Sequence, residues 1–381
     1  MSEFISSSAV LARTLIVGLG ETGVAAARWC ARNDVPLRIT DTRAEPTGLA
    51  ALKDALGQAQ VEFYLGCDVF PANLLEGVDC LVLSPGLAPG LSPVKELLAD
   101  ARAANIEVIG EIELFARALK QLNVAQNYSP RVIGITGTNG KTTVTAWARL
   151  MLQTAGINAR VAGNISPAAL YALMDAMDQY DLPDVWVLEL SSFQLETTTS
   201  LHMQAAAVLN VTQDHLNWHG DMESYARAKA RIFGMTDLCL VNRDDARVMA
   251  MIENINAMNV RSFGRDQPML TGDVGLETNH DVHWFVSAEL TEFEDESATP
   301  VRRKKGAPAP VRQPGRLVRL MPVDALAVRG MHNALNCQVA MLLARVAGAS
   351  WSPMLRAAHD YVGEPHRMAF VRSIRGIDFF N

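Results

Sequence analysis

The sequence is poor in cysteine, and the cysteines that it has form no pattern. They are odd in number and widely scattered: Cys30, Cys67, Cys80, Cys239 and Cys337. No Cys-x-x-Cys pair occurs, so neither a disulfide framework nor a zinc cluster is expected. A reduced, cytoplasmic chain is the simplest interpretation.

Basic charge is the second shortage. Lys and Arg number 34 against 41 Asp and Glu, so the formal net charge is −7. Nucleic-acid-binding proteins normally carry an excess of basic residues, and this balance argues against that class. Small anionic ligands remain compatible with it, because backbone amides at a helix N-terminus bind anions without net positive charge.

A signal peptide and long apolar runs are absent as well. Residues 1–10 lack the basic and apolar regions of a secretory signal. No apolar run reaches the ~18 residues of a membrane span, so no membrane association is expected. What the chain has is 49% hydrophobic and 20% charged residues, which predicts a packed globular protein. Its 381 residues predict two or three domains.

The first motif is a glycine-rich turn, Gly18-Leu-Gly-Glu-Thr-Gly23. It follows an apolar run over residues 13–17 and precedes a predicted helix over 24–33 and a strand over 37–40. Strand, turn, helix and strand open a doubly wound α/β domain. The glycines permit close approach of a pyrophosphate, and Asp41 stands where a ribose of NAD is usually held. Tight strand–helix packing without a ligand is the alternative, and Asp41 with Thr42 and Arg43 could equally read the edge of a base.

The second motif is a phosphate loop. A polar segment over residues 123–130 is interpreted as a linker, after which a strand over 131–135 leads into the loop and a helix over 141–154. Seven residues form the loop and are the predicted ATP-binding set: Gly137, Thr138, Asn139, Gly140, Lys141, Thr142 and Thr143. Ile135 occupies the first glycine position of G-x-x-x-x-G-K-[ST], so the motif is a shortened variant. Lys141 could neutralise β/γ-phosphate oxygens and Thr142 could hold Mg²⁺. A nucleoside triphosphate is therefore implied more firmly than NAD.

Two later strands end in candidate metal ligands. The strand over 185–188 is followed by Glu189, and the strand over 206–209 leads to His215. A carboxylate and an imidazole at adjacent strand ends could hold two metal ions against one phosphate chain. His215 alone would more often be a structural histidine, and Lys229 alone would be a solvated helix cation.

Two further segments stand apart. Residues 289–320 contain an acidic cluster followed by Arg302-Arg-Lys-Lys305, which is typical of a surface excursion. Residues 376–381 read as the middle of a strand, which suggests a third domain that is begun and not completed.

Together the motifs resemble the Mur ligases of peptidoglycan synthesis, over about residues 13–381. Three further motifs bring the resemblance nearest to the D-glutamate-adding members: Ser84-Pro85-Gly86, Gly110-Glu-Ile-Glu-Leu-Phe115 and Leu188-Glu-Leu-Ser-Ser-Phe-Gln-Leu-Glu196. The resemblance implies a cytoplasmic, monomeric ligase that uses ATP to join D-glutamate to UDP-N-acetylmuramoyl-L-alanine through an acyl phosphate. It also implies an N-terminal Rossmann-like domain (1–127), a central ATP-binding α/β domain (128–361) and a truncated C-terminal Rossmann-like domain (362–381).

The resemblance further implies a UDP site in place of an NAD site. The residues expected to line it, with those reaching the substrate from the central domain last, are Glu21, Thr22, Asp41, Thr42, Arg43, Ser84, Pro85, Gly86, Asn164, Ser191 and Gln194. Asn333 would lie beside adenine and Arg367 beside the phosphates of ATP.

The catalytic residues implied by the resemblance are Lys141, His215 and Lys229. Thr142 and Glu189 would hold the first of two Mg²⁺ ions, and His215 with a carbamylated Lys229 would serve the second. Asn217 departs from the aspartate common in the family. Two rivals remain: a nucleotide-binding module without ligase activity, because the closing lobe is missing, and a nicotinamide dehydrogenase, which rests on the glycine turn and Asp41 alone.

Overall fold

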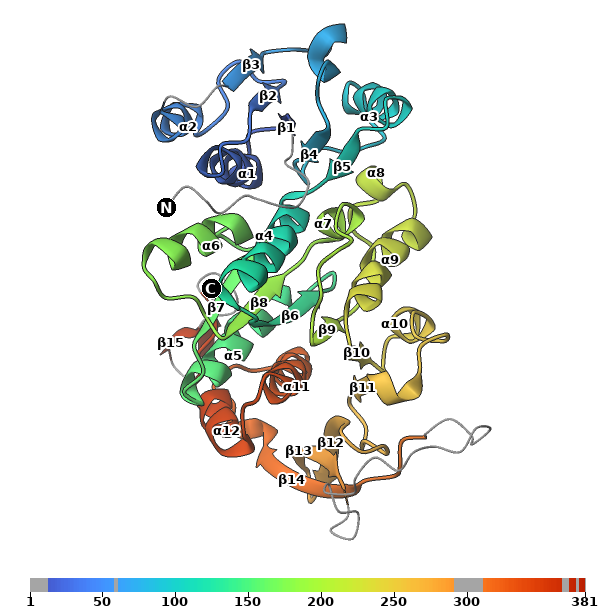
Figure 1. Ribbon diagram of the computed structural model, residues 1–381. Coiled ribbons are helices and arrows are strands. Elements are labelled where there is room, and N and C mark those ends of the chain that lie inside the picture. The colour runs from blue at the N-terminus through green and yellow to red at the C-terminus, as the bar shows by residue number, and fades with distance from the viewer. Residues whose placement is uncertain (1–12, 58–60, 291–310, 365–369, 375–376, 381) are drawn as a thin grey trace, which may run out of the picture.

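The computed structural model describes residues 13–57, 61–290, 311–364, 370–374 and 377–380. Two parallel sheets dominate it (Figure 1). The N-terminal sheet has the order β3-β2-β1-β4-β5, and the central sheet has the order β11-β10-β9-β6-β8-β7. Within the described residues, no helix is both long and apolar enough to cross a membrane.

The N-terminal unit consists of five strands and the helices that cover them. The strands are β1 (Thr14–Val17), β2 (Leu37–Asp41), β3 (Val61–Leu65), β4 (Cys80–Leu83) and β5 (Glu107–Ile109). The helices are α1 (Glu21–Arg32), α2 (Leu49–Leu56), α3 (Val94–Ala103) and α4 (Glu111–Gln126), with a 3₁₀ turn η1 (Ala72–Leu75). β1 is buried on both faces, which is why it reads as one continuous apolar run.

The central unit repeats this plan with longer connections. Its strands are β6 (Arg131–Thr136), β7 (Ala159–Gly163), β8 (Val185–Glu189), β9 (Ala205–Val208), β10 (Cys239–Asn242) and β11 (Val260–Phe263). Its helical segments are α5 (Lys141–Thr154), α6 (Ala169–Asp178), α7 (Ser192–Glu196), α8 (Leu216–His219), α9 (Met222–Ala230), η2 (Arg231–Met235), α10 (Ala246–Ala250) and η3 (Ala257–Asn259). The two parallel α/β units confirm the predicted fold class.

Antiparallel elements complete the described chain. A three-stranded sheet joins β12 (Val274–Asn279), β13 (Val282–Glu289) and β14 (Arg316–Pro322), and a hairpin joins β15 (Phe370–Ile374) to β16 (Ile377–Phe380). After β14 come η4 (Val323–Ala325), α11 (Met331–Val346) and α12 (Trp351–Asp360), and both long helices pack on α5. The predicted excursion over 289–320 therefore begins and ends in strands, and its residues 291–310 lie outside the described part.

The two units share one apolar cluster. It runs from Ile16 in β1 through Phe115 in α4 to Trp186 in β8, and the rings of Phe115 and Trp186 meet edge to face at 5.3 Å. Figure 1 shows α4 and α6 side by side where the units meet. This packing holds the glycine-rich loops after β1 and β6 in a fixed relation to each other.

Two local predictions were wrong. From the sequence, residues 108–119 read as one helix, but the helix starts at Glu111, because Val108 pairs with Leu81 in the parallel ladder of β4 and β5. The expected linker over 123–130 is helical as far as Gln126, since Leu122 is still buried and the polar residues after it occupy the exposed side. Only at Asn127, with a φ of 55°, does the helix end.

Candidate active site

The phosphate loop lies between β6 and α5, as predicted. Its two glycines are required by contact: a Cβ on Gly137 would lie 2.9 Å from Cβ of Leu209, and one on Gly140 would lie 2.6 Å from Oδ1 of Asn336. Gly140 also has a φ of +86°, which favours glycine. The loop amides open directly onto the N-terminus of α5, the arrangement that binds phosphate.

Asn210 holds this loop in shape, and the sequence did not identify that role. Its Oδ1 accepts hydrogen bonds from the backbone N–H groups of Thr138 at 3.1 Å and Asn139 at 2.9 Å. Its Nδ2 donates to the carbonyl of Asn139 at 3.1 Å. The Thr138 hydroxyl in turn lies 3.2 Å from the Tyr225 hydroxyl. The strand end after β9 thus fixes the loop from one side.

Two lysines converge on one carbonyl of the loop. Nζ of Lys141 donates to the carbonyls of Gly137 and Thr138, both at 3.0 Å, and Nζ of Lys229 donates to the carbonyl of Gly137 at 2.9 Å. Lys229 is buried and lies 4.5 Å above the ring centre of Tyr225. Burial and the charge of Lys141 lower its pKa to about 7 against the opposing pull of Asp214. The structure thus supplies an amine that loses its proton near neutrality.

Glu189 and Thr142 form the second cluster. The Thr142 hydroxyl donates to Oε2 of Glu189 at 2.9 Å, and Nδ2 of Asn164 donates to Oε1 at 3.0 Å. The backbone N–H of Asn164 also donates to the carbonyl of Glu189 at 2.7 Å. A carboxylate and a hydroxyl side by side at a phosphate loop are hard oxygen donors of the kind that Mg²⁺ takes. These two side chains therefore fit one ion.

His215 lies at the other edge of the loop. It precedes α8 with a φ of 51°, and its ring contacts Phe193 at 4.9 Å and Tyr225 at 6.3 Å between centroids. Tyr225 is thus shared between His215 and Lys229. Among the described residues, no group of three His, Cys, Asp or Glu side chains forms a ready metal site. A second ion held by His215 and Lys229 would need the extra anionic oxygens of a carbamate, and it stays a prediction.

His219 is a neighbour that the sequence did not reveal. Its Nε2 lies 2.9 Å from the Ser192 hydroxyl, and its ring packs 5.1 Å from that of Tyr225. Burial, with the nearby charges of Lys229 and His215, lowers its pKa to about 4. His219 is therefore neutral at physiological pH and adds an uncharged wall to this edge of the site.

The glycine turn of the N-terminal unit is built by close packing. A Cβ on Gly23 would lie 1.9 Å from the carbonyl oxygen of Gly18, which also accepts a hydrogen bond from the Ser84 hydroxyl at 2.7 Å. A Cβ on Gly20, by contrast, would have no atom within 4 Å. Gly23 therefore serves the packing of strand and helix, and Gly20 leaves open space at the start of α1.

Asp41 closes the turn from the next strand. Its Oδ2 accepts from the backbone N–H of Leu19 at 2.7 Å, and its Oδ1 accepts from the backbone N–H and Nε of Arg43, both at 2.9 Å. Burial alone would raise its pKa, but the bonds from Arg43 and Leu19 outweigh burial and lower it. Thr42 is exposed beside this pair, and Pro85 and Gly86 follow the buried Ser84 at the end of β4.

The remaining predicted residues have other partners. Ser191 and Gln194 form a capping box at the start of α7, and Thr22 lies half-buried in the first turn of α1. Asn333 is buried, donates to the carbonyl of Arg329 at 2.8 Å and contacts Asn336 at 3.3 Å, close to Gly140. Thr143 follows Thr142 in the first turn of α5. Arg367 lies outside the described residues.

Glu21 points away from the glycine turn. Its Oε1 accepts from the Ser166 hydroxyl and from the backbone N–H of Ala168, both at 2.9 Å, in the loop between β7 and α6. Glu111 accepts from the backbone N–H of Leu170 in the same helix start. Both glutamates of the N-terminal unit thus bind the central unit.

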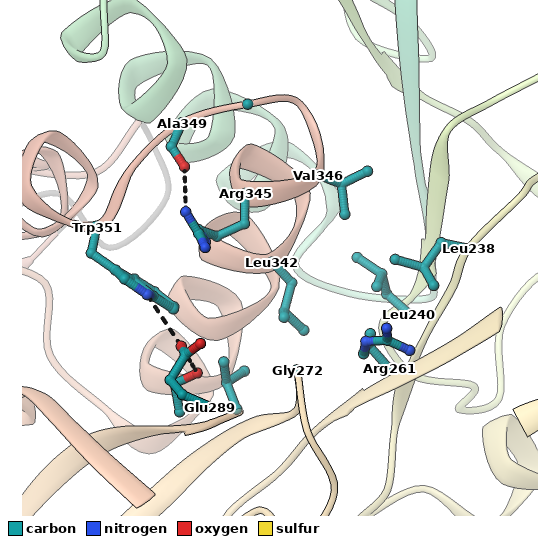
Figure 2. A pocket seen from close by; sticks show the side chains of 13 residues that line it. Leu238, Leu240, Arg261, Gly272, Glu289, Leu342, Arg345, Val346, Ala349 and Trp351 are labelled. Atoms are coloured by element: carbon teal, nitrogen blue, oxygen red, sulfur yellow. Dashed lines mark hydrogen bonds between the residues drawn. The ribbon is translucent and has the colours of Figure 1, made fainter. Parts of the chain in front are cut away.

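A cavity far along the central unit contains none of the predicted residues. It has a volume of about 320 Å³ and lies between α11, α12 and the strands β10 to β13 (Figure 2). Glu289 accepts a hydrogen bond from Nε1 of Trp351 at 3.2 Å, and Arg345 donates to the carbonyl of Ala349 at 3.1 Å. Arg261, which also lines the cavity, donates to the carbonyls of Met258 and Val260, and the phosphate loop forms no part of the lining.

Comparison with known proteins identifies the class. The family described as "Mur ligase middle domain" matches residues 135–344, and the family "Mur ligase MurD-like, N-terminal domain" matches residues 12–110. The chain belongs to the Mur ligase family.

Particular relatives carry a single name, UDP-N-acetylmuramoylalanine–D-glutamate ligase. The protein of that name from Bordetella bronchiseptica is 61% identical over 377 residues, which cover 99% of this chain and 74% of the relative. The one from Ralstonia nicotianae is 50% identical and covers 96% and 72%.

Solved structures support the fold. A UDP-N-acetylmuramate:L-alanyl-γ-D-glutamyl-meso-diaminopimelate ligase from Neisseria meningitidis superposes with a TM-score of 0.55 at 14% identity, over 93% of this chain and 100% of that chain. A UDP-N-acetylmuramoyl-L-alanyl-D-glutamate–2,6-diaminopimelate ligase superposes with a TM-score of 0.51 at 23% identity, over 78% and 63%.

Proposed function

We propose that this protein is an ATP-dependent ligase that adds D-glutamate to UDP-N-acetylmuramoyl-L-alanine in cytoplasmic peptidoglycan synthesis. The observation that carries the proposal is the identity of 61% to a D-glutamate ligase across 99% of the chain. The relatives' shared name favours a ligase over a nucleotide-binding module without activity. The dehydrogenase alternative is wrong, since the chain belongs to the Mur ligases, which use ATP. An ATP-dependent ligase also gives the phosphate loop a role, which a dehydrogenase does not.

The nucleotide would bind on the phosphate loop. The amides at the start of α5 would face the phosphates, and the ammonium of Lys141 could turn from the loop carbonyls to a γ-phosphate oxygen. Asn333 lies behind Gly140 on the path to the adenine. These residues position ATP and neutralise charge that develops during transfer.

The UDP moiety would bind at the glycine turn. Gly20 leaves the start of α1 open to a pyrophosphate, and Thr22 lies in the first turn of the helix. Thr42 and Arg43, held in place by Asp41, would meet the uracil. Ser84, Pro85 and Gly86 border the turn from β4. Ser191 and Gln194 would meet the acyl end of the substrate from the central unit.

The reaction needs an activated carboxylate. An oxygen of the L-alanine carboxylate attacks the γ-phosphorus, its bond to ADP breaks, and an acyl phosphate results. The amine of D-glutamate then attacks the acyl carbon, loses a proton and expels phosphate, which leaves the amide. Both steps build negative charge on oxygen, and preorganised cations lower the barrier by binding that charge.

Magnesium would add further positive charge to the phosphate oxygens when bound. Thr142 and Glu189 would hold one ion, and His215 with a carbamylated Lys229 would hold a second. The Lys229 amine suits carbamylation because its pKa of about 7 leaves much of it neutral at physiological pH. Addition of CO₂ to the neutral nitrogen, with loss of one proton, gives an anionic oxygen ligand.

The domain bounds 1–127, 128–361 and 362–381 and a monomeric state remain predictions.

The test is release of phosphate from ATP that requires both UDP-N-acetylmuramoyl-L-alanine and D-glutamate. Lys141→Ala should lower the rate by ~10²-fold or more, because a group that binds transition-state charge is removed. Lys120→Ala, which removes an exposed lysine of α4, is the matched control and should leave the rate unchanged. Full turnover by Lys141→Ala would refute the assignment of the ATP site.

Substrate binding is tested separately by calorimetry. UDP-N-acetylmuramoyl-L-alanine should bind saturably, and Asp41→Ala should weaken binding because Arg43 and Leu19 lose their common anchor. Binding that is unaffected by Asp41→Ala would place the UDP site elsewhere.

A further inference from the structure

The glycine turn and the metal-ligand cluster are joined through one loop of the central unit, which is hydrogen-bonded at both ends. The bonds at one end are made by Glu21, which directly follows Gly20 at the first position of α1. Oε1 of Glu21 receives two donors from the central unit, the Ser166 hydroxyl and the Ala168 backbone N–H, both at 2.9 Å. One side chain thus joins the nucleotide turn of one unit to a loop of the other.

The other end of that loop contacts Glu189, the last residue of β8. Gly163 begins it with a φ of +114°, and a Cβ there would lie 2.3 Å from the carbonyl oxygen of Glu189, so backbone meets backbone. The next residue, Asn164, binds Glu189 twice, through its backbone N–H at 2.7 Å and its Nδ2 at 3.0 Å. The loop is closed on itself by the Gly163 N–H, which donates to the Pro167 carbonyl at 3.2 Å. The loop is therefore held at both ends, by Glu189 at Asn164 and by Glu21 at Ala168.

A second glutamate holds the same helix start. Glu111, the first residue of α4, accepts from the backbone N–H of Leu170. The N–H groups of the first turn of α6 have no partner inside the helix, and carboxylates are favoured at that end. α6 is thus capped by two glutamate side chains from the other unit, and Figure 1 shows it beside α1 and α4.

We propose that Glu21 is a positioning residue of the reaction: it anchors the loop between β7 and α6 so that Asn164 holds the Glu189 carboxylate beside Thr142. This inference rests on the proposed function, in which Glu189 and Thr142 hold Mg²⁺. It reassigns Glu21, which the resemblance placed against the ligand, to a role that acts through Asn164.

The variants separate this role from direct ligand contact. Glu21→Ala removes the acceptor, and Glu21→Gln keeps one side-chain oxygen for the two donors. Ser166→Ala removes one donor from the other side. Glu76→Gln, at an exposed glutamate of the same unit, is the matched control.

Three readouts are measured on each variant. Calorimetry gives the affinity for UDP-N-acetylmuramoyl-L-alanine. A Mg²⁺ titration of the binding of a non-hydrolysable ATP analogue gives the metal-dependent affinity. Hydrogen exchange gives the protection of the Ala168 and Leu170 amides without any ligand.

Glu21→Ala should speed exchange at Ala168 and weaken Mg²⁺-dependent nucleotide binding by about tenfold, the lower end of what loss of an outer partner of a metal ligand costs. Affinity for the UDP substrate should change less than about twofold, and Glu21→Gln should restore Mg²⁺-dependent binding. In an Asn164→Ala background the Glu21→Ala effect should vanish, because the side-chain bond from the loop to Glu189 is already lost.

Two results would overturn the proposal. One is weaker UDP-substrate binding with unchanged Mg²⁺ dependence, which would make Glu21 a ligand contact. The other is faster exchange with no change in Mg²⁺ dependence, which would leave Glu21 a purely structural residue. If the unsubstituted chain bound neither ligand, the proposed function itself would be refuted, and the positioning role of Glu21 would lose its basis.

Discussion

Lys229 shows how one residue acquires its chemistry from its neighbours. Burial and the charge of Lys141 both lower the pKa of its ammonium, while the Tyr225 ring and the Gly137 carbonyl favour the charged form. The balance leaves a pKa of about 7, where an ordinary lysine would have 10.5. The unfolded chain therefore binds this proton more tightly, and stability gained from the site rises as the pH increases from about 7 towards 10.5.

The predicted carbamate can be observed directly. With ¹³C-labelled bicarbonate, a carbamate resonance should grow as the pH rises through about 7, because only the neutral amine adds CO₂. Lys229→Met should abolish this resonance and also abolish ligase turnover. An unchanged resonance in Lys229→Met would show that another amine reacts.

Residue roles divide into those that the sequence predicted and those that it could not. Lys141 and Thr142 were predicted from the loop motif alone, since the motif dictates both the fold and the chemistry of the loop. Asn210 and His219 gain their roles through contacts with distant residues, and a single sequence shows no sign of such contacts. The resemblance placed Glu21 at the ligand, and our proposal instead gives it a positioning role, because its two donors lie on the other unit.

At the scale of the element, the glycine turn before α1 supplies a matched pair of substitutions. Gly23→Ala should lower the free energy of unfolding by roughly 1–3 kcal/mol or more, and the thermal midpoint with it. The reason is that its Cβ would lie 1.9 Å from a backbone oxygen. Gly20→Ala should lower the midpoint much less, since its φ is −79° and no atom lies within 4 Å, so only the poorer N-cap contributes.

The two substitutions should have the opposite order of effect on the affinity for the UDP substrate, measured by calorimetry on folded variants. Gly20→Ala should weaken binding of the UDP substrate, because a methyl group would occupy the approach of the pyrophosphate. Equal affinity in Gly20→Ala and the unsubstituted chain would mean that the pyrophosphate does not approach this glycine.

Strands and helices were predicted best where they are buried and continuous. The runs that became β1, β4, β6 and β8 are mostly apolar, and the glycine loops after β1 and β6 mark where α1 and α5 begin. The errors fall at α4, whose start competes with the three-residue strand β5 and whose polar end resembles a linker. Helix ends and short strands depend on packing against other elements, which no local pattern encodes.

At the scale of the whole molecule, Glu111 makes the contact between the units sensitive to pH. Burial, reinforced by the charge of Glu21, raises its pKa from 4.5 to about 7 against the bond from Leu170. The folded protein therefore holds a proton that the unfolded chain releases, and stability falls as the pH rises from about 4.5 to about 7. The full effect is on the order of 3 kcal/mol, at about 1.4 kcal/mol for each unit of pKa.

Glu111→Gln should remove this dependence. The amide resembles the protonated acid, so the variant should be more stable than the unsubstituted protein at about pH 8 and similar to it at about pH 5. Thermal unfolding at both values is the measurement, and Glu76→Gln again serves as an exposed control. A parallel pH dependence in Glu111→Gln and the unsubstituted protein would contradict this role.

The arrangement of the units was the hardest feature to predict. The sequence indicated two α/β units, but several of the polar contacts that join them are donated by backbone N–H groups of Ala168, Leu170, Thr199 and Ser200. Every residue has such a group, so its identity carries no signal. Only the glutamates that accept from them are visible in the sequence.

The supports of the phosphate loop have a consequence for the order in which this protein becomes competent during synthesis. The loop leaves the ribosome well before Asn210, which follows Thr138 by 72 residues, and long before Asn336, which packs against Gly140. Contacts of such sequence separation form late. A nascent chain therefore carries the complete motif without its working shape, and it gains affinity for ATP only when α11 has folded back onto α5.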